Sequence, residues 1–310
     1  MEIGIGAPVS GAWAGPGQLA EFGRLAEELG YGALWSFQRL LAPADGGGDA
    51  VYRSVLDPLL ALAYAAAHTS RVRLGVALVN APFVSPTYLA KQASTLDVLS
   101  GGRFDLGLGL GWSPLEFAAT GAEQAHRGRR IEEYVSVLRA LWAPGPVAFE
   151  GEYHHVPASR MEPKPVQPGG PPILLGGVVP AALARAGRIA DGWMSRSGTV
   201  LAGIGGEIAV VRAAAERAGR DPDALRIVCR GVVRYDASGA GTPDAAGRRL
   251  PLSGSAAQIA EDAAVLAEKG VTELFYDLNW DPRIGDPAAD AAAAAERAEE
   301  IIRALAPAAA

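Results

Sequence analysis

The sequence of 310 residues is poor in several residue types on which common functional sites depend. It has one cysteine, Cys229, and four histidines without metal-ligand spacing, which excludes an internal disulfide framework and a structural zinc site. The first residues lack a signal-peptide pattern, and no apolar run approaches the ~20 residues of a membrane span. We therefore predict a cytoplasmic protein from a reducing compartment, with no bound metal.

Positive charge is also scarce. The 28 basic residues, of which only three are lysines, face 34 acidic ones, and the net charge is −6. The longest basic cluster is the short run Arg127–Arg130. Such a chain has no electrostatic footprint for nucleic acid or an anionic membrane, so we expect neither as a partner. Its 49% of hydrophobic residues is instead typical of a globular protein with a sizeable core.

The sequence does contain a regular alternation of short apolar runs with longer helical patterns, which is typical of β-α-β units. The expected strands are Ile3–Val9, Ala33–Ser36, Val72–Val79, Phe104–Leu110, Ile173–Gly176, Gly192–Ser195, Leu225–Tyr235 and Glu273–Leu278. The expected helices are Gly17–Leu29, Leu56–His68, Thr87–Leu99, Ile131–Trp142, Ala181–Ile189, Gly206–Ala218, Ala256–Lys269 and Ala288–Leu305.

Eight such units favour a closed (β/α)8 TIM barrel, an α/β fold, over an open doubly wound sheet, because no dinucleotide fingerprint follows the first strand. We expect a single domain over residues 1–310. Segments rich in proline or glycine at about 144–172 and 236–252 interrupt the alternation, and we interpret them as excursions from the barrel. The first of them is expected to hold a short hairpin around Val147–His155.

Four segments together resemble the bacterial luciferase-like monooxygenase superfamily. They read AEELGYGALW at 26–35, LAKQASTLDVLSGGR at 89–103, DLGLGLGW at 105–112 and ILLGGVVPAALARAGRIADGWMSRS at 173–197. The resemblance implies a barrel with an inserted segment, an active site at the C-terminal ends of the strands, and a bound flavin or deazaflavin. The stretch AGRIADGW resembles the branch that uses the deazaflavin coenzyme F420, with FMN as the alternative cofactor.

The turn after the fifth strand is the candidate phosphate site. Gly176 and Gly177 let backbone approach a ligand, and the amides through Val178 and Val179 begin a helix whose dipole favours an anion. From the residues alone, a plain strand–helix turn explains the Gly-Gly pair as well. Its place at a strand end and the family resemblance favour the phosphate. The side chains of Ser195 and Ser197 would then offer hydroxyl donors.

Two further segments are candidate contacts for the ring system of the cofactor. The run GLGLG in the fourth strand lacks the spacing of a phosphate loop, and we expect Gly109 and Gly111 to keep the barrel mouth open for a flat ring, with close packing as the alternative. At Ala77, Leu78 and Asn80 the resemblance implies a bulge that supports the middle ring, often through a non-proline cis peptide. An ordinary strand end is the alternative there.

The residues after the second strand depart from the family pattern. Where the resemblance implies an acidic residue and a histidine that serve alcohol oxidation, this chain has Gln38 and Arg39. Gln38 does not titrate and Arg39 stays protonated, so neither is a general base. Arg39 would instead bind an anionic group or stabilise negative charge on a carbonyl oxygen or enolate. The alternative is a rim residue paired with a carboxylate such as Asp45 or Asp49.

These features predict an oxidoreductase that moves hydride between coenzyme F420 and a small organic substrate. Because the general base is missing, we expect a reductase of an activated C=C or C=N bond, with Arg39 and Gln38 as the candidate catalytic residues. Trp13, Phe37 and Trp112 are expected to line the substrate pocket, and a homodimer is considered. An FMN-dependent monooxygenase and a non-catalytic flavin-binding barrel subunit are the alternatives.

Overall fold

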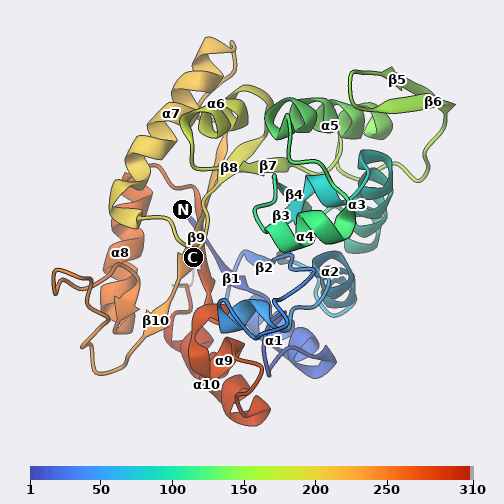
Figure 1. Cartoon of the computed structure of the whole chain (residues 1–310). Coiled ribbons are helices and arrows are strands. Elements are labelled where there is room, and N and C mark those ends of the chain that lie inside the picture. Colours follow the sequence, from blue (N-terminus) through green and yellow to red (C-terminus); the bar gives the residue numbers. More distant parts are fainter. Residues whose placement is uncertain (308–310) are drawn as a thin grey trace.

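The computed structural model describes residues 1–307 and confirms the closed barrel of eight parallel strands. Around the barrel the strands follow the order β1-β12-β9-β8-β7-β4-β3-β2. They are β1 (Glu2–Gly6), β2 (Ala33–Ser36), β3 (Arg73–Asn80), β4 (Phe104–Gly109), β7 (Ile173–Gly176), β8 (Gly192–Met194), β9 (Arg226–Val232) and β12 (Glu273–Asp277). Figure 1 shows the ring of strands with the helices outside it.

The helices begin mostly at prolines, whose fixed φ and missing N–H suit the first helical position. They are α1 (Pro16–Glu28), α2 (Pro58–Ala66), α3 (Pro86–Ser100), α4 (Pro114–Thr120), α5 (Arg127–Trp142), α6 (Pro180–Ile189), α7 (Ile204–Arg217), α8 (Ala256–Glu268), α9 (Pro282–Gly285) and α10 (Ala291–Ala304). Short 3-10 turns are η1 (Ala50–Tyr52), η2 (Ala81–Phe83), η3 (Leu201–Gly203) and η4 (Leu278–Trp280). Within residues 1–307, no helix combines the length and apolar character needed to span a membrane.

Both predicted excursions leave the barrel. The first contains the expected hairpin, formed by β5 (Val147–Glu150) and β6 (His155–Ser159), which projects from the barrel beside α5 (Figure 1). The carboxylate of Glu133 in α5 accepts the backbone N–H groups of the hairpin loop. In the second excursion, β10 (Arg234–Tyr235) pairs with β11 (Ser253–Gly254), and the residues between them are largely exposed.

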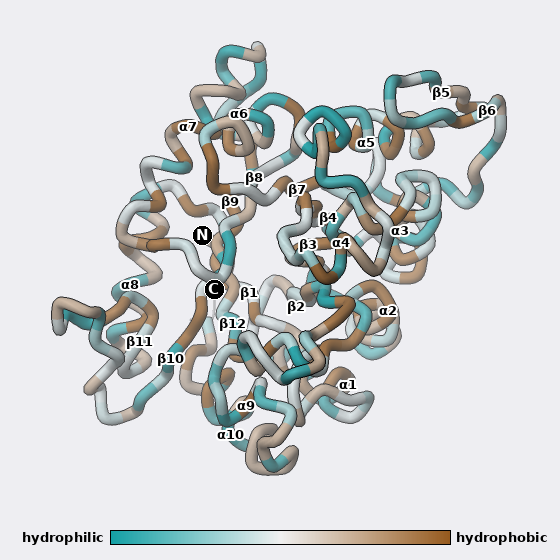
Figure 2. Tube along the Cα trace, viewed as in Figure 1, coloured by the Kyte–Doolittle hydropathy of each residue, from teal (hydrophilic) through white to brown (hydrophobic). Residues whose placement is uncertain are grey.

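The middle of the barrel is filled by two stacked rings. Trp35 and Phe275 lie with their ring centroids 5.4 Å apart and their planes at 20°. Glycines make room for them: a Cβ on Gly75 would lie 2.3 Å from the Trp35 ring. Figure 2 shows hydrophobic residues recurring on the strands and on the helices around them. Shape-matched packing of this kind, rather than a pore, is usual inside small barrels.

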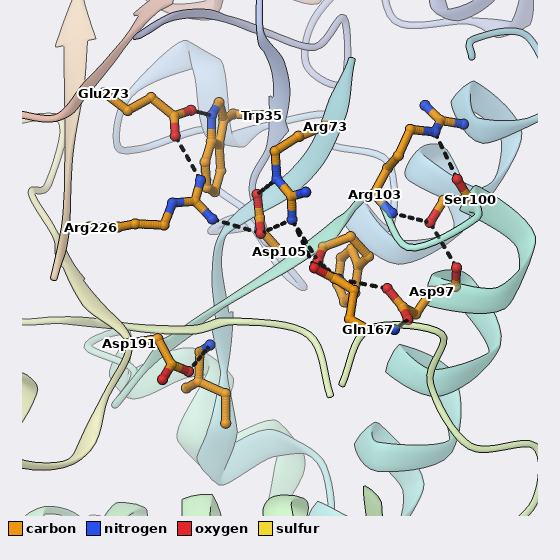
Figure 3. Close-up of polar contacts among 12 residues, drawn as sticks. Trp35, Arg73, Asp97, Ser100, Arg103, Asp105, Gln167, Asp191, Arg226 and Glu273 are labelled. Atoms are coloured by element: carbon orange, nitrogen blue, oxygen red, sulfur yellow. Dashed lines mark hydrogen bonds and ion pairs between the residues drawn. The ribbon is translucent and has the colours of Figure 1, made fainter. Parts of the chain in front are cut away.

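The N-terminal end of the barrel is closed by a polar cluster that we call the lower network: Trp35, Arg73, Asp105, Arg226 and Glu273 (Figure 3). Asp105 is fully buried and pairs with Arg73 and, at 2.7 Å, with Arg226. Glu273 pairs with Arg226 at 2.7 Å and accepts the indole N–H of Trp35 at 2.6 Å. Burial alone would lower the pKa of Arg226, but the two carboxylates raise it. Every carboxylate oxygen of the network therefore has a partner.

Candidate functional site

The opposite end of the barrel, which we call the mouth, is lined by aromatic side chains from loops that follow the strands. The ring of Tyr52 in η1 lies at their centre. Its centroid is 6.1 Å from that of Phe37, 6.1 Å from that of Trp112 and 5.5 Å from that of Trp280. Phe37 is buried, whereas Trp112 is 64% exposed. Both rings contact Tyr52 at the mouth, and their role in lining a substrate pocket remains a prediction.

Arg39 lies between two of these rings. Its guanidinium carbon is 4.7 Å from the Tyr52 centroid and 4.4 Å from the Trp112 centroid. The alternative interpretation paired Arg39 with a carboxylate such as Asp45 or Asp49. Arg39 does pair with a carboxylate, but with another one: its Nε lies 3.6 Å from buried Glu116 in α4, whereas Asp45 and Asp49 are exposed.

Glu116 also accepts the backbone N–H of Leu40 at 2.8 Å, which fixes the carboxylate next to the β2 loop. At 3.6 Å the contact between Glu116 and Arg39 is an ion pair without a hydrogen bond. The buried Nε of Arg39 makes no hydrogen bond within residues 1–307. The two rings and Glu116 thus hold the guanidinium in place, while its Nε–H can still donate a hydrogen bond.

Gln38 has a supporting position. Its side-chain oxygen accepts the backbone N–H of Asn80 at 2.8 Å, which ties the loop after β2 to the end of β3. This hydrogen bond occupies the backbone N–H of Asn80 and holds the side-chain carbonyl of Gln38 against β3. A direct catalytic contact of Gln38 remains a prediction.

The end of β3 carries the bulge that the family resemblance implied. Pairing with β4 skips from Val76 to Val79, and Ala77 and Leu78 fall between the paired residues. The Ala77–Leu78 peptide bond is cis. The Leu78 side chain turns over the neighbouring strands, where a Cβ on Gly176 would lie 2.3 Å from its Cδ1.

The glycines of β4 are explained by this bulge. A Cβ on Gly107 would lie 2.1 Å from the Val76 carbonyl oxygen, and one on Gly109 would lie 3.2 Å from the Asn80 side chain. Gly111 adopts φ +69° and packs against two phenylalanine rings. Close packing, the alternative weighed for these residues, therefore accounts for them. A contact of Gly109 or Gly111 with a cofactor ring remains a prediction.

The turn from β7 into α6 contains the residues predicted to hold the phosphate. Gly177 adopts φ +155°, and its carbonyl oxygen accepts the Trp193 indole N–H at 2.9 Å. No side chain in the described structure caps the N-terminus of α6 at Val179, and the side chains of Val178 and Val179 are exposed. A cofactor contact here is untested, because a strand–helix turn also requires this glycine conformation.

Two predicted positions need correction. Ser195 is only 2% exposed; its hydroxyl accepts the Arg230 backbone N–H at 2.9 Å and lies 3.8 Å from the Cys229 sulfur, so it is not free for a phosphate. Ser197, two residues later, is half-buried, and its contact with a phosphate remains a prediction. Trp13, in the loop between β1 and α1, is 1% exposed and packs edge-on against Phe22 of α1, in a region that also includes residues of α10, so it does not line the mouth.

Sequence reasoning missed a charged pair in the mouth. Arg230 in β9 donates through Nε to Asp277 at the end of β12, at 2.7 Å, and its side chain is 8% exposed. Its guanidinium lies 4.7 Å from the Phe37 ring and donates to the Ala77 carbonyl oxygen at 3.3 Å. One signal was present: an arginine interrupts an otherwise apolar buried strand.

Asn279 in η4 adds a buried acceptor to the mouth. Its side-chain nitrogen donates to the Ala7 carbonyl at 3.1 Å and to Asp277 at 3.0 Å. Because both neighbours are acceptors, the orientation of this amide is fixed. Its buried side-chain oxygen accepts no hydrogen bond from the described part of the chain.

A side cavity of about 250 Å³ lies next to the mouth, between η2 and the start of α5. Arg127, Arg130, Tyr134 and His154 are among its lining residues. Burial lowers the pKa of His154, so its imidazole is neutral near pH 7. In residues 1–307 no group of three or more histidine, cysteine, aspartate or glutamate side chains is placed to hold a metal ion.

Comparison with known sequences identifies relatives that match part of the chain. The family model described as "Luciferase-like monooxygenase" matches residues 2–240. An uncharacterized protein of Mycobacterium tuberculosis is 40% identical over 130 residues, which cover 42% of this chain and 44% of that protein. The F420-dependent glucose-6-phosphate dehydrogenase of Amycolatopsis mediterranei is 31% identical over 198 residues, covering 63% of this chain and 57% of that enzyme. The chain thus spans about half the length of the curated relatives it matches.

Comparison with solved structures extends over nearly the whole chain. The monooxygenase RslO1 from Streptomyces bottropensis aligns with a TM-score of 0.79 at 25% identity, covering 98% of both chains. An F420-dependent secondary alcohol dehydrogenase in complex with an F420-acetone adduct aligns with a TM-score of 0.76 at 18% identity, covering 98% of this chain and 99% of that one. At 18% identity the likeness to the dehydrogenase extends to the fold alone.

Proposed function

The chain belongs to the luciferase-like monooxygenase family, and on that premise we propose that it is an oxidoreductase that transfers hydride between coenzyme F420 and a small organic substrate. The 31% identity with an F420-dependent dehydrogenase supports this cofactor over FMN. We further propose that this chain works as a reductase. The observation that carries this direction is Arg39, a fixed cation held between Tyr52 and Trp112 where a general base would stand.

The mouth offers features that fit a deazaflavin. The bulge at Ala77 and Leu78 faces strands whose inward positions are glycines, so flat backbone and one apolar side chain form the floor. The uncapped amides from Gly177 to Val179, with the Ser197 hydroxyl, would hold the phosphate. When bound, the deazaflavin supplies or accepts the hydride; the protein supplies position and charge.

The residues of the mouth suit an electron-poor double bond conjugated to a carbonyl. Hydride addition at the β-carbon moves the electron pair of the C=C bond toward the carbonyl oxygen, and a proton from solvent then reaches the α-carbon. Arg39 would donate to that oxygen while negative charge develops on it. Phe37, Tyr52 and Trp112 offer flat surfaces for a planar substrate and exclude water around it.

Titration of the purified protein with F420 and with FMN, followed by fluorescence quenching, tests the cofactor. We expect F420 to bind at micromolar concentrations or tighter and FMN more weakly. Stoichiometric co-purification of FMN without quenching by F420 would overturn the assignment. The direction is tested by oxidation of reduced F420 in the presence of enones and imines. Consumption only with oxygen would indicate a monooxygenase, and binding without turnover would indicate a non-catalytic barrel.

We also propose a homodimer. Leu60 and Tyr64 of α2 and Tyr88 and Leu99 of α3 are exposed apolar side chains on adjacent helices. Exposed apolar side chains on neighbouring helices can form an interface. Light scattering of the purified protein measures the mass, and replacing Leu60 and Leu99 with glutamate should convert the dimer to a monomer. A monomeric wild-type protein would refute the proposal.

A further inference from the structure

Arg230 connects opposite walls of the barrel. It extends from β9, and in the closed order β1-β12-β9-β8-β7-β4-β3-β2 the strand opposite β9 is β3. One terminal nitrogen donates to the Ala77 carbonyl oxygen of the β3 bulge at 3.3 Å. Ala77 falls in the gap of the β3–β4 pairing, so Arg230 holds a carbonyl that the strand ladder does not use.

The charge of Arg230 is directed toward the bulge. Its partner Asp277 lies on β12, next to β9, while the guanidinium extends toward Ala77 and the face of Phe37. The second terminal nitrogen lies 2.6 Å from the same Asp277 oxygen that accepts the Nε–H, so this carboxylate holds both nitrogens in an ion pair. The almost fully buried guanidinium therefore keeps its charge at the floor of the mouth, in contact with the Ala77 carbonyl oxygen of the bulge.

We infer that Arg230 is a positioning residue that fixes the β3 bulge and places a positive charge beneath the ring bound on it. This inference rests on the proposed function, because it takes that ring to be the redox cofactor. Reduction adds electrons to the ring, so a nearby fixed cation favours the reduced form over the oxidised one. Arg230 would therefore raise the reduction potential of the bound cofactor.

The test compares the affinities of oxidised and reduced F420 for the wild type and for Arg230→Met, measured by anaerobic fluorescence titration. We expect the preference for the reduced form to fall about tenfold in the variant, or ~30 mV for a two-electron couple. Arg230→Lys, which retains the charge, should keep the preference within about threefold of wild type. Arg73→Met is the matched control, because it removes a barrel arginine at the opposite end and should leave the preference unchanged.

Removal of Arg230 alone leaves Asp277 buried without its partner, which is expected to be strongly destabilising. The double variant Arg230→Met, Asp277→Asn avoids this charge and should still show a reduced preference. If either folded variant binds both forms with the wild-type ratio, the inference is wrong.

A second measurement needs no cofactor. Hydrogen exchange at the backbone amides of Leu78 and Val79 should become at least tenfold faster in the double variant than in the wild type, because the bulge loses its cross-barrel contact. Unchanged exchange would refute the positioning role. Failure of the wild type to bind F420, together with faster exchange in the variant, would refute the proposed function and keep the positioning of the bulge.

Discussion

Both ends of the barrel contain arginines beside buried carboxylates, but the two ends differ in how completely their polar groups are hydrogen-bonded. In the lower network, every oxygen of the two buried carboxylates and the Trp35 indole N–H has a partner within the network. In the mouth, Arg39 also lies beside a buried carboxylate, yet its Nε and the Asn279 side-chain oxygen have no hydrogen-bond partner within residues 1–307.

We interpret this difference as one between polar groups that hold the fold and polar groups that can receive a ligand. A completed buried network stabilises one fold and leaves nothing for a ligand. An incomplete one costs stability in the free protein unless something enters to complete it. The arrangement agrees with barrels in general, where stability residues gather at the N-terminal face and functional ones at the C-terminal face.

The largest effect is expected from Asp105→Ala. This change leaves Arg73 and Arg226 without their shared buried carboxylate and should lower the free energy of unfolding by about 3–5 kcal/mol. Urea denaturation followed by circular dichroism measures it. As a control, Asp244→Ala removes a carboxylate paired with exposed Arg248 and should cost less than about 1 kcal/mol. Equal losses in the two variants would erase the distinction between network and surface pairs.

At the mouth, Arg39→Ala should affect turnover rather than folding. Loss of a charged donor aimed at developing negative charge typically costs ~3 kcal/mol in the barrier, about 100-fold in rate. Steady-state kinetics with reduced F420 and an enone measures the rate, and F420 affinity should stay near wild type. Arg129→Ala, at an exposed pair, is the control. A change below about 1 kcal/mol would reduce Arg39 to a rim residue.

A gain-of-function variant tests whether the chain lacks only the general base for alcohol oxidation. The change Gln38→Asp with Arg39→His introduces the acid–histidine pair that the family resemblance implies for alcohol oxidation. We expect this double variant to oxidise alcohols with F420 as acceptor, at a rate measured by the loss of F420 absorbance. A wild type that already oxidises alcohols, and does so without loss in Arg39→Ala, would contradict the reductase assignment.

Substitutions of Ser195 and Ser197 by alanine form a matched pair with smaller expected effects, one on stability and the other on F420 binding. Ser195→Ala removes the acceptor of the buried Arg230 N–H and should cost about 1–3 kcal/mol of stability. Ser197→Ala should leave thermal unfolding unchanged and weaken F420 binding by about 1 kcal/mol, roughly fivefold. If Ser197→Ala binds F420 normally, the phosphate is held elsewhere.

The smallest effect concerns Cys229. Burial raises the pKa of its thiol to about 12, from an ordinary value of 9.0. The raised folded-state pKa contributes stability that is present in full below pH 9 and is lost as the pH rises toward 12. Iodoacetamide at pH 8 should therefore not label the native protein but should label it in urea, as mass spectrometry can show. Rapid native labelling would indicate an opening of β9.

The sequence predicted the barrel because each strand and helix carries a local signal: apolar runs, prolines at helix starts and glycines at helix ends. The short helices α4 and α9 were not predicted, because segments of seven and four residues are too short to show a helical period. The lower network was not predicted either, for another reason. Asp105, Arg226 and Glu273 are distant in the chain, and only closure of the barrel brings them together.

The same limit applies to the site. Arg39 and Gln38 were identified because they follow a strand and depart from a pattern, but the partner Glu116 lies in the undetected helix α4. Ser195 was misjudged because residues next to each other at a strand end alternate between solvent and the interior. Its hydroxyl faces β9, and nothing in the local sequence indicates that neighbour.

The exposure of Trp112 gives the protein a built-in optical probe. Of the six tryptophans, Trp13, Trp35, Trp142 and Trp193 are buried, whereas Trp112 is 64% exposed beside Arg39. Iodide should therefore quench the Trp112 emission before that of the buried indoles. Any molecule that settles against Arg39 would shield this ring, so entry into the mouth can be followed in real time without a label.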